Sequence, residues 1–575
     1  MPDLPTTSGE QCQTTRGELS QTTQCAIQLV AANEIVLNKS KPLTAPGPHQ
    51  IVCRVEAVGL CFSDLKLLKQ FSAHPRKMEI ISGIEPDILR EIPSYVPADK
   101  PTVPGHEAVV RIEAIGEGVT QFKPGQRYLV ETDYRWLPTA QSNGSFGYNF
   151  EGALQEYVLM DERVITSPQG ESMLIPVSEQ LSASAAALIE PMACVENAYT
   201  SSERQRIKQG GNMLIAADVV VTTGELTELF KQYGQPGKII WASQYKSHEV
   251  TGVVMEPCPD ISRLTDAGFD DVIYLGCNPD RVEALFSKVG PQGLFNIVLC
   301  GERFHRDIVV PIGRIHYSGI RITGTIGYEP ADSMKHIPAG GEVRKGDKIN
   351  VIGAAGPMGT MHVIRNIWRH TEGTSVSAGD TDDGRLAALL KLAEPLAAAN
   401  AISYKQYNPS KEKIAELSDY SVLMASAPEL AAGSVHNSAK RAIINIFAGI
   451  PSAASARIDL DSYIEKQLYF IGTSGSVLED MKQVLAQVES GQFDTNLLVA
   501  AVSGLDGACD GLKAIENKQT AGKIIVYPAC RDLPLTTLAK LPEKMPDVAA
   551  CLINGFWSPQ AEQKLLQRFA SGTNG

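Results

Sequence analysis

Apolar and polar residues follow two different rhythms along this chain. In the first part, apolar residues form short runs between glycine and proline turns, and the clearest runs are 50–58, 108–115, 127–131 and 154–160. Runs of this length predict β-strands, so we expect an irregular β-rich domain between about residues 26 and 160. From about residue 212, strand-like runs alternate with helix-length segments, which predicts parallel α/β construction.

The α/β part contains the same sequence pattern twice. The segment 320–327, IRITGTIG, returns as 468–475, LYFIGTSG, and Asp332 after the first copy matches Asp480 after the second. An offset near 148 residues that persists across several elements predicts a duplicated domain. The alternative is chance resemblance, because strands of parallel sheets are all short runs rich in valine and isoleucine.

We name the two copies module A, residues 205–338, and module B, residues 339–500. Module B opens with a strand at 348–352, then a glycine turn at 353–359 and an apolar helix. A glycine turn between strand and helix lets the backbone approach a pyrophosphate, which then lies on the helix N-terminus. The next strand, at 375–379, ends at Asp380.

Asp380 bears on the choice of dinucleotide. A carboxylate about 20 residues beyond the turn accepts hydrogen bonds from the ribose hydroxyls of NAD and repels the 2′-phosphate of NADP. Asp382 and Asp383 add negative charge at the same place. The residues expected to contact the cofactor are Ala354, Gly356, Pro357, Met358, Gly359, Asp380 and Arg385. The alternative is a turn that is merely structural.

Module A begins with a similar strand but lacks the glycine turn. At the corresponding place it reads Asp218, then three valines, then two threonines. Valine does not adopt the positive φ values that glycine allows, and its side chain prevents close approach of a ligand to the backbone. We therefore expect module A to have a nucleotide-binding architecture without a nucleotide, and to play a structural role.

Composition narrows the class of function. A chain of 575 residues predicts about three to five domains, and its formal charge of −13 argues against a nucleic-acid partner. No apolar run approaches the ~18 residues of a membrane span. The first 24 residues are polar, without the apolar core of a secretory signal, and the eleven cysteines include no Cys-x-x-Cys pair. We expect a cytoplasmic protein.

Three residues from distant segments have the chemistry of zinc ligands. Cys61 lies in GLCFSD, His106 in PGHE and Glu190 in EPMAC. A thiolate, an imidazole and a carboxylate with one open position are the ligands of a catalytic zinc. Each residue taken alone has a simpler explanation: a packed thiol, a solvated turn and a carboxylate at a helix start.

These motifs resemble those of the zinc-dependent medium-chain dehydrogenases/reductases in the alcohol dehydrogenase superfamily, and within them the sorbitol and threonine dehydrogenase-like branch. The stretches that carry the resemblance are 58–64, 103–107, 189–198, the module B turn and a closing strand at 521–528. The resemblance implies one catalytic zinc held by Cys61, His106 and Glu190. It implies that Glu107 either ligates the metal directly or exchanges with water.

The same resemblance gives two residues beside Cys61 a role in catalysis. Ser63 would relay the proton of the substrate hydroxyl, and Asp64 would orient a metal ligand. The zinc acts in this family as a Lewis acid that lowers the pKa of a bound alcohol, and the hydride passes to the nicotinamide held by module B.

The chain departs from the family near the expected metal. Many members bind a structural zinc through four cysteines, but the matching stretch 131–152 has no cysteine, so we expect no structural zinc. The connection 71–102 is longer than usual and is a candidate part of the substrate pocket. Four residues are candidates either to line that pocket or to pack elsewhere: Tyr134, Arg135, Trp136 and Tyr148.

The expected fold is α/β plus β-rich, with a GroES-like catalytic domain and two tandem Rossmann-type doubly wound domains, of which the first is degenerate. A polar tail (1–24) precedes the catalytic domain (25–204, completed by 501–528), and a helical extension (529–575) follows it. In that extension Ser558 is expected to cap a helix that ends near Phe569, anchored by Phe556 and Trp557.

We therefore expect an NAD-dependent zinc alcohol dehydrogenase that acts on a secondary hydroxyl of a polyol, sugar alcohol or related small metabolite. Two alternatives are a zinc-free enone or quinone reductase of the same superfamily and an NAD-binding sensor or scaffold without turnover. The expected partner is a small alcohol or ketone, with no nucleic acid and no membrane. Family dimers commonly join through their nucleotide domains, so the chain forms either a homo-oligomer or an internal pseudo-dimer through module A.

Overall fold

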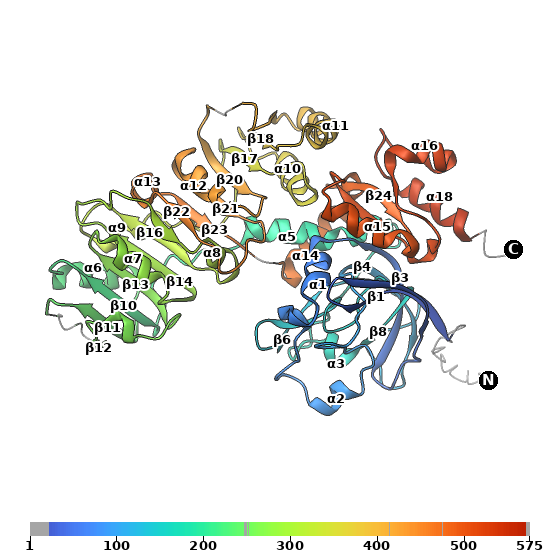
Figure 1. Ribbon diagram of the computed structural model, residues 1–575, viewed down its shortest axis with the longest axis horizontal. Coiled ribbons are helices and arrows are strands. Elements are labelled where there is room, and N and C mark those ends of the chain that lie inside the picture. The colour runs from blue at the N-terminus through green and yellow to red at the C-terminus, as the bar shows by residue number, and fades with distance from the viewer. Residues whose placement is uncertain (1–21, 247–249, 251, 413–414, 474, 571–575) are drawn as a thin grey trace, which may run out of the picture. The chain divides into compact units, whose positions relative to one another are not determined.

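A computed structural model describes residues 22–246, 250, 252–412, 415–473 and 475–570 (Figure 1). The chain divides into two compact units. The first unit extends to Pro191 and resumes at Met481, and the second is Met192–Asp480. Within the described ranges no helix is long and apolar enough to cross a membrane.

The first unit is built on an eight-stranded sheet that joins the two ends of the chain. Its strand order is β26-β24-β25-β3-β4-β5-β9, and β8 also pairs with β3. The strands are β3 (Gln50–Gly59), β4 (Glu107–Ile115), β5 (Arg127–Val130), β8 (Tyr157–Asp161), β9 (Leu174–Pro176), β24 (Val499–Ser503), β25 (Lys523–Val526) and β26 (Thr536–Thr537). The late strand β25 is antiparallel to β3, opposite Val58 and Gly59, and so completes the sheet.

Smaller elements surround this sheet. Strands β1 (Thr23–Ala31) and β2 (Glu34–Pro42) pair with each other, as do β6 (Asp133–Pro138) and β7 (Asn143–Ser145). The helical elements before residue 192 are α1 (Phe62–Gln70), η1 (Phe71–Ala73), η2 (Pro75–Lys77), α2 (Pro86–Arg90), α3 (Glu162–Ile165), α4 (Ala183–Ala187) and the start of α5 (Ile189–Thr200). The long connection 71–102 thus contains three short helical turns.

The C-terminal part of the first unit is helical. Its elements are the end of α14 (Leu478–Glu489), then η4 (Thr495–Leu498), α15 (Leu505–Glu516), η5 (Pro528–Cys530), η6 (Leu538–Lys540), α16 (Leu541–Lys544), α17 (Pro546–Ala549) and α18 (Pro559–Ala570). The Ser558 hydroxyl accepts a hydrogen bond from the backbone N–H of Ala561, as an N-cap does. Trp557 is buried and donates to the hydroxyl of Tyr527, whereas Phe556 is only half-buried.

The second unit contains two six-stranded parallel sheets with the same strand order (Figure 1). In module A the order is β12-β11-β10-β13-β14-β16, and in module B it is β19-β18-β17-β20-β21-β23. Both correspond to the doubly wound order 3-2-1-4-5-6, in which ligands bind at the carboxyl ends of the strands where the order reverses. A nucleotide-binding type of architecture is therefore present twice.

The strands and helices of the two modules have the following bounds. The strands of module A are β10 (Asn212–Ala217), β11 (Lys238–Ser243), β12 (Val254–Pro257), β13 (Phe269–Leu275), β14 (Val289–Val298) and β16 (Arg321–Thr325). Its helices are α6 (Thr223–Tyr233), η3 (Ile261–Arg263), α7 (Pro279–Phe286), α8 (Ile312–Tyr317) and α9 (Pro330–Met334). In module B the strands are β17 (Lys348–Ile352), β18 (Ser375–Gly379), β19 (Ser403–Tyr407), β20 (Ser418–Leu423), β21 (Ser438–Ile446) and β23 (Tyr469–Ile471). Its helices are α10 (Pro357–Arg369), α11 (Asp383–Ala399), α12 (Glu429–His436) and α13 (Leu460–Glu465).

The two modules contact each other through equivalent elements. Strand β15 (Ile308–Val310) of module A pairs antiparallel with β22 (Ala456–Ile458) of module B, and Val309 lies opposite Arg457. The two strands lie at the same offset, about 148 residues, as the sequence repeats. Pairing of an element with its own counterpart is the geometry of a two-fold interface.

Two glycine contacts obey the same relation. A Cβ at Gly324 would lie 2.7 Å from Cγ1 of Ile464, and a Cβ at Gly472 would lie 2.9 Å from Cα of His316. Gly324 and Gly472 are one repeat apart, and so are His316 and Ile464. Each module therefore uses a glycine to admit the same helix of the other module. The interface has internal two-fold symmetry, while the duplication of an ancestral domain stays a prediction.

Candidate metal and dinucleotide sites

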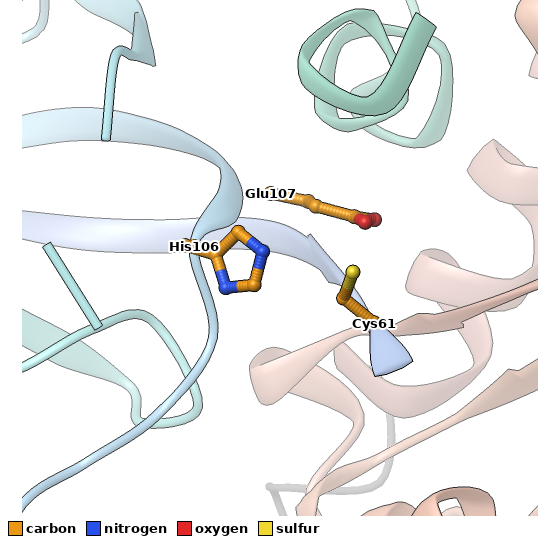
Figure 2. Close-up of side chains that lie close together, drawn as sticks. All are labelled: Cys61, His106 and Glu107. Atoms are coloured by element: carbon orange, nitrogen blue, oxygen red, sulfur yellow. The ribbon is translucent and has the colours of Figure 1, made fainter. Parts of the chain in front are cut away.

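Three candidate ligands from the first unit come together. One ligand atom of each of Cys61, His106 and Glu107 lies within 4.8 Å of the others (Figure 2). The side chains of His106 and Glu107 are buried, and Cys61 is half-buried. A thiol, an imidazole and a carboxylate at this spacing offer the ligand types of a catalytic zinc site.

The central strands of the sheet place these ligands. Cys61 follows the end of β3 and is the N-cap residue of α1, while His106 directly precedes β4 and Glu107 is its first residue. Strands β3 and β4 are antiparallel, with Gly59 opposite Glu107. A Cβ at Gly59 would lie 2.1 Å from Oε2 of Glu107, so only glycine leaves room for the carboxylate.

Asp64 connects the segments that carry Cys61 and His106. Its Oδ2 accepts a hydrogen bond from the backbone N–H of Cys61 (2.9 Å), and its Oδ1 accepts one from the N–H of Gly105 (3.2 Å). The same Oδ1 lies 3.3 Å from Nδ1 of His106, without the alignment of a good hydrogen bond. Asp64 is therefore placed to orient the imidazole, as carboxylates beside metal-bound histidines do.

Tyr148 and Asp64 also affect the charge of His106. Burial alone would lower the pKa of the imidazole, but Tyr148, Asp64 and Cys61 together raise the pKa of His106 well above its usual value. A metal ligand must be the neutral imidazole, so metal binding here would release a proton.

The two carboxylate oxygens of Glu107 have different surroundings. Its Oε1 accepts a hydrogen bond from the ammonium of Lys523 on β25, and both side chains are buried. Its Oε2 is buried and has no hydrogen-bond partner. Burial alone would lower the pKa of Lys523, but Glu107 and Cys61 outweigh it, so the pKa is raised and the ammonium is charged. The free Oε2 is the oxygen available to a metal ion.

Glu190 lies near this cluster but not within it. It belongs to the first turn of α5 and is buried, and the cluster within 4.8 Å does not include it. Burial raises the pKa of Glu190 to about 7, with Glu107 adding to the rise and His106 and Lys523 opposing it. Of the two carboxylates predicted as ligands, Glu107 is therefore the one within the cluster, and Glu190 lies outside it.

Ser63, the predicted proton relay, contacts the cluster through sulfur. Its hydroxyl lies 3.0 Å from Sγ of Cys61, and either group can be the donor. The Ser63 hydroxyl is thus within hydrogen-bond distance of the sulfur that would bind the metal. This position suits a group that passes a proton from a metal-bound hydroxyl.

A cluster of aromatic rings lies against His106. The ring of Tyr148 lies 5.5 Å from that of His106 and stacks on His74 at 5.1 Å. The guanidinium of Arg76 lies 5.2 Å from the centre of the Tyr148 ring and pairs with Asp133 at 3.0 Å. The unusually long connection 71–102 therefore contributes His74 and Arg76 beside the candidate metal site.

The four residues predicted either to line the substrate pocket or to pack elsewhere differ in burial. Tyr134 and Tyr148 are almost fully buried, while Arg135 is exposed and Trp136 is half-buried. Tyr134 packs edge-on against Phe150 at 5.5 Å. Tyr148 contacts a candidate ligand, since its ring lies 5.5 Å from that of His106.

Two buried ionisable residues near the cluster were not identified from the sequence. Lys523 begins an otherwise apolar closing strand. A lysine in such a strand predicts a buried ammonium, which needs a negatively charged partner, so the sequence did contain a signal for this residue. Glu131 is buried, and its Oε2 has no hydrogen-bond partner. Burial, followed by the carboxylates of Asp133 and Glu190, raises the pKa of Glu131 to about 8. No sequence motif marks Glu131, because its neighbours come from other segments.

The residues present fit a zinc ion. A half-buried thiol, a buried imidazole and a buried carboxylate oxygen without a partner converge from the start of α1 and the start of β4. An unpaired buried oxygen beside other ligand types is costly unless a cation satisfies it. Among the described residues this is the one group of three such side chains that close together.

The glycine turn of module B has the form of a dinucleotide site. Gly353 has φ of +87°, which glycine adopts readily, and it makes the turn after β17. Around Gly356 no atom lies within 4 Å of a built Cβ, so the backbone there is open. A Cβ at Gly359 would lie 2.3 Å from the carbonyl oxygen of Gly353, so glycine is needed where α10 packs on the turn. These are the three separate tasks of the glycines in such turns.

The start of α10 is left open for an anion. Its N-cap is Gly356, which supplies no capping side chain, Pro357 follows, and no acidic residue stands in the first turn. Met358 is half-buried, while Ala354 is buried under the turn. The first N–H groups of an uncapped helix and the positive end of its dipole are what a pyrophosphate needs.

Asp380 is held against this turn. Its Oδ2 accepts a hydrogen bond from the N–H of Ala355 (3.1 Å), and its Oδ1 accepts one from Asp382 N–H (3.1 Å). The guanidinium of Arg385 donates to the same Oδ1 at 2.7 Å. Two of the predicted cofactor-binding residues, Asp380 and Arg385, are therefore paired with each other. Asp380 is fixed at the carboxyl end of β18, beside the turn that it was expected to complement.

Comparisons with known proteins agree with this architecture. Residues 47–169 match the alcohol dehydrogenase GroES-like domain. The chain is 26% identical to sorbitol dehydrogenase of Halalkalibacterium halodurans over 243 residues, which are 40% of this chain and 55% of that protein. It is 26% identical to (R,R)-butanediol dehydrogenase of Bacillus subtilis over 267 residues, which are 40% of this chain and 64% of that protein. The alignments thus span only about half to two thirds of these relatives.

The fold itself has a counterpart among solved structures. A structure of 2R,3R-butanediol dehydrogenase from Bacillus subtilis is matched with a TM-score of 0.51 at 16% identity, over 88% of this chain and 100% of that one. The GroES-like match, the two named dehydrogenases and the shared fold agree with one another. These similarities support a medium-chain dehydrogenase/reductase of the alcohol dehydrogenase superfamily, with residues 47–169 as its GroES-like domain.

Proposed function

We propose that this protein is a zinc-dependent dehydrogenase that transfers a hydride between NAD(H) and a secondary alcohol or ketone. Its substrate would be a polyol, a sugar alcohol or a related small metabolite. Relatives that carry the names sorbitol dehydrogenase and butanediol dehydrogenase favour this substrate class. Metal, coenzyme and substrate are all part of the proposal.

The observation that carries the proposal is the convergence of Cys61, His106 and Glu107. Their ligand atoms lie within 4.8 Å of one another, and Oε2 of Glu107 is buried without a partner. Bound there, a zinc ion would polarise the substrate hydroxyl and make it more acidic. Glu190, buried nearby, would serve as a further ligand or as the carboxylate that exchanges with water.

The chain's own residues would manage the proton and the orientation of the ligands. Ser63 would receive the hydroxyl proton of the substrate, because its hydroxyl is already 3.0 Å from the Cys61 sulfur. Asp64 would hold the imidazole of His106 in place through its contact at 3.3 Å. Lys523 would keep Oε1 of Glu107 occupied, so that Oε2 alone faces the metal.

The coenzyme part of the proposal rests on module B. An uncapped helix start at Gly356, with open space around that glycine, would accept the pyrophosphate of NAD. Asp380 would bind the adenosine ribose, with Arg385 holding the carboxylate in position. Bound NAD would supply the hydride acceptor for alcohol oxidation.

The same proposal gives module A the place of a partner subunit. Its pairing with module B through β15 and β22 and through Gly324 and Gly472 has the two-fold relation of a dimer interface. We therefore infer an internal pseudo-dimer, in which this interface is satisfied within one chain.

The test is metal content and turnover of the purified protein. We expect one zinc per chain and NAD reduction with a panel of polyols and secondary alcohols. Cys61→Ala should lose both the zinc and the turnover, because a thiolate ligand is removed. Cys551→Ala, which changes a half-buried cysteine in the C-terminal helical part, is the matched control and should retain both. Absence of zinc from active wild-type protein, or full activity of Cys61→Ala, contradicts the proposal.

A further inference from the structure

Module A contains a cavity of about 780 Å³ that the dehydrogenase function does not use. It lies at the carboxyl ends of β10, β13 and β14, where the strand order of the sheet reverses. This is the position at which open parallel sheets bind ligands, and the volume is that of a small-molecule pocket. We propose that the cavity is a second binding site and that its ligand is a small organic cation with an apolar body.

The start of α6 shows why the ligand is not a dinucleotide. The N-cap Thr222 accepts a hydrogen bond from the N–H of Glu225, and Glu225 in turn accepts one from the N–H of Thr222. This capping box occupies two of the N–H groups at the helix start and places a carboxylate where a pyrophosphate would lie. In module B the equivalent helix begins at an uncapped glycine with no acidic residue in its first turn.

The ribose side of a dinucleotide also has no anchor here. The second strand of module A, β11, ends at Ser243 and is followed by Gln244, whereas its counterpart β18 is followed by Asp380. The loop after β10 carries Asp218 and valines in place of a glycine turn. The sequence predicted that module A binds no nucleotide. The structure gives a local reason at the place where the pyrophosphate would lie and another where the ribose would lie.

The charges at the cavity select a cation. All charged side chains that line it are acidic, namely Asp218, Glu225 and Glu302. Asp218 is paired with Arg281 and accepts a hydrogen bond from the Tyr274 hydroxyl at 2.5 Å, so its position is fixed by the fold. Glu302 is exposed at the rim. A phosphate or carboxylate ligand would meet net negative charge, and an ammonium group would meet complementary charge.

The walls are apolar and include one aromatic ring. They are formed by Val219, Val220, Leu275, Pro279 and Leu299, with Cys277 and Cys300 in the loops that follow β13 and β14. Tyr328 is 62% exposed and lines the same cavity. Gly301, with φ of +83°, permits this arrangement, because a Cβ there would lie 2.8 Å from the Tyr328 hydroxyl. An exposed tyrosine ring beside carboxylates is a favourable surface for an ammonium group.

Cys277 and Cys300 allow occupancy to be measured at the cavity itself. The full-length protein is treated with N-ethylmaleimide, and alkylation of each cysteine is followed by peptide mass spectrometry. Three probes share one ring and differ in charge: benzyltrimethylammonium, benzyl alcohol and phenylmethanesulfonate. Cys258, which is half-buried in the same unit but does not line the cavity, reports non-specific effects.

We expect benzyltrimethylammonium to slow alkylation of Cys277 and Cys300 and to leave Cys258 unchanged, with phenylmethanesulfonate giving no protection. Glu302→Lys should weaken protection about two- to fivefold, as expected for one partly solvated charge. Glu372→Lys, at an exposed site of module B, is the matched control and should leave protection unaltered. NAD binding should be the same in all variants, because neither substitution lies in the module B turn or at Asp380. Equal protection by the three probes, protection by none, or no effect of Glu302→Lys overturns the proposal.

Discussion

The ammonium of Lys523 donates a hydrogen bond to Oε1 of Glu107, a residue 416 positions earlier in the chain. Both side chains are buried, and the pair lies beside Cys61 and His106. The late strand β25 thus does more than close the sheet. It brings a positive charge to the carboxylate that we propose as a metal ligand, and it fixes which oxygen of that carboxylate is free.

Removal of this charge should destabilise the protein. Lys523→Met leaves the carboxylate of Glu107 buried and unpaired, which typically costs about 3–5 kcal/mol of unfolding free energy. Denaturant unfolding of the metal-free protein measures this loss. Lys523→Arg keeps the charge and should recover most of the stability. A loss below about 1 kcal/mol for Lys523→Met would show that the pair contributes little.

The buried carboxyl of Glu131 predicts a pH dependence of stability. Its pKa of about 8 in the folded protein exceeds the ordinary value of about 4.3 for an unfolded chain. The folded state therefore binds the proton more tightly, so this contribution is complete below the lower pKa and is lost as pH rises toward 8. Between pH 6 and 8, metal-free wild-type protein should lose about 2 kcal/mol more unfolding free energy than Glu131→Gln. Parallel pH profiles of the two proteins would contradict the buried, protonated state of Glu131.

Two alanine substitutions in the module B turn should affect different properties, since one should weaken NAD binding and the other should destabilise the fold. Gly356→Ala adds a methyl group where no atom lies within 4 Å, so stability should change by less than about 0.5 kcal/mol. The methyl group would occupy the space of the pyrophosphate, and NAD affinity should fall by about tenfold or more. Gly359→Ala meets the carbonyl of Gly353 at 2.3 Å and should cost about 1–3 kcal/mol of stability. Isothermal titration with NAD and denaturant unfolding separate these effects. Unchanged NAD affinity in Gly356→Ala counts against the site.

The contact between modules A and B should resist a larger side chain. Gly324→Val places Cβ 2.7 Å from Cγ1 of Ile464 and 2.8 Å from the carbonyl of Ile297, which should cost about 1–3 kcal/mol. Gly433→Ala in α12 is the control, because no atom lies within 4 Å of its Cβ and alanine favours a helix by about 0.5–1 kcal/mol. Light scattering should give the mass of one chain for the wild type. A dimer that dissociates when the edge strand β16 is altered would contradict the internal pseudo-dimer.

The sequence predicted local features of the fold well. Strands at 348–352 and 375–379 match β17 and β18, because each is a short apolar run followed by a turn signal. The strand expected at 154–160 was displaced, since β8 is Tyr157–Asp161. Its first residues instead hydrogen-bond outside the strand, with Leu154 donating to the carbonyl of Pro104. Tertiary contacts of this kind leave no periodic signal in the sequence.

The candidate sites were predictable only where a motif is local. Cys61, Asp64 and His106 lie in short motifs, and the structure brings them together. Lys523 and Glu131 depend on burial and on partners from other segments, so their roles follow from packing alone. The module A cavity is a similar case, because its lining comes from loops after several strands of one sheet.

The most direct measurement of the proposed reaction follows one hydrogen atom. Sorbitol deuterated at C2 is incubated with the protein and NAD, and the coenzyme is analysed by mass spectrometry. We predict deuterium in the NADH formed by zinc-loaded protein, none after the zinc is removed by chelation, and recovery when zinc is restored. If sorbitol proves inactive, the secondary alcohol that gives most turnover in the panel replaces it, deuterated at its carbinol carbon. Deuterium transfer that persists undiminished in zinc-free protein, or zinc-loaded protein that transfers none from any alcohol of the panel, would contradict the account.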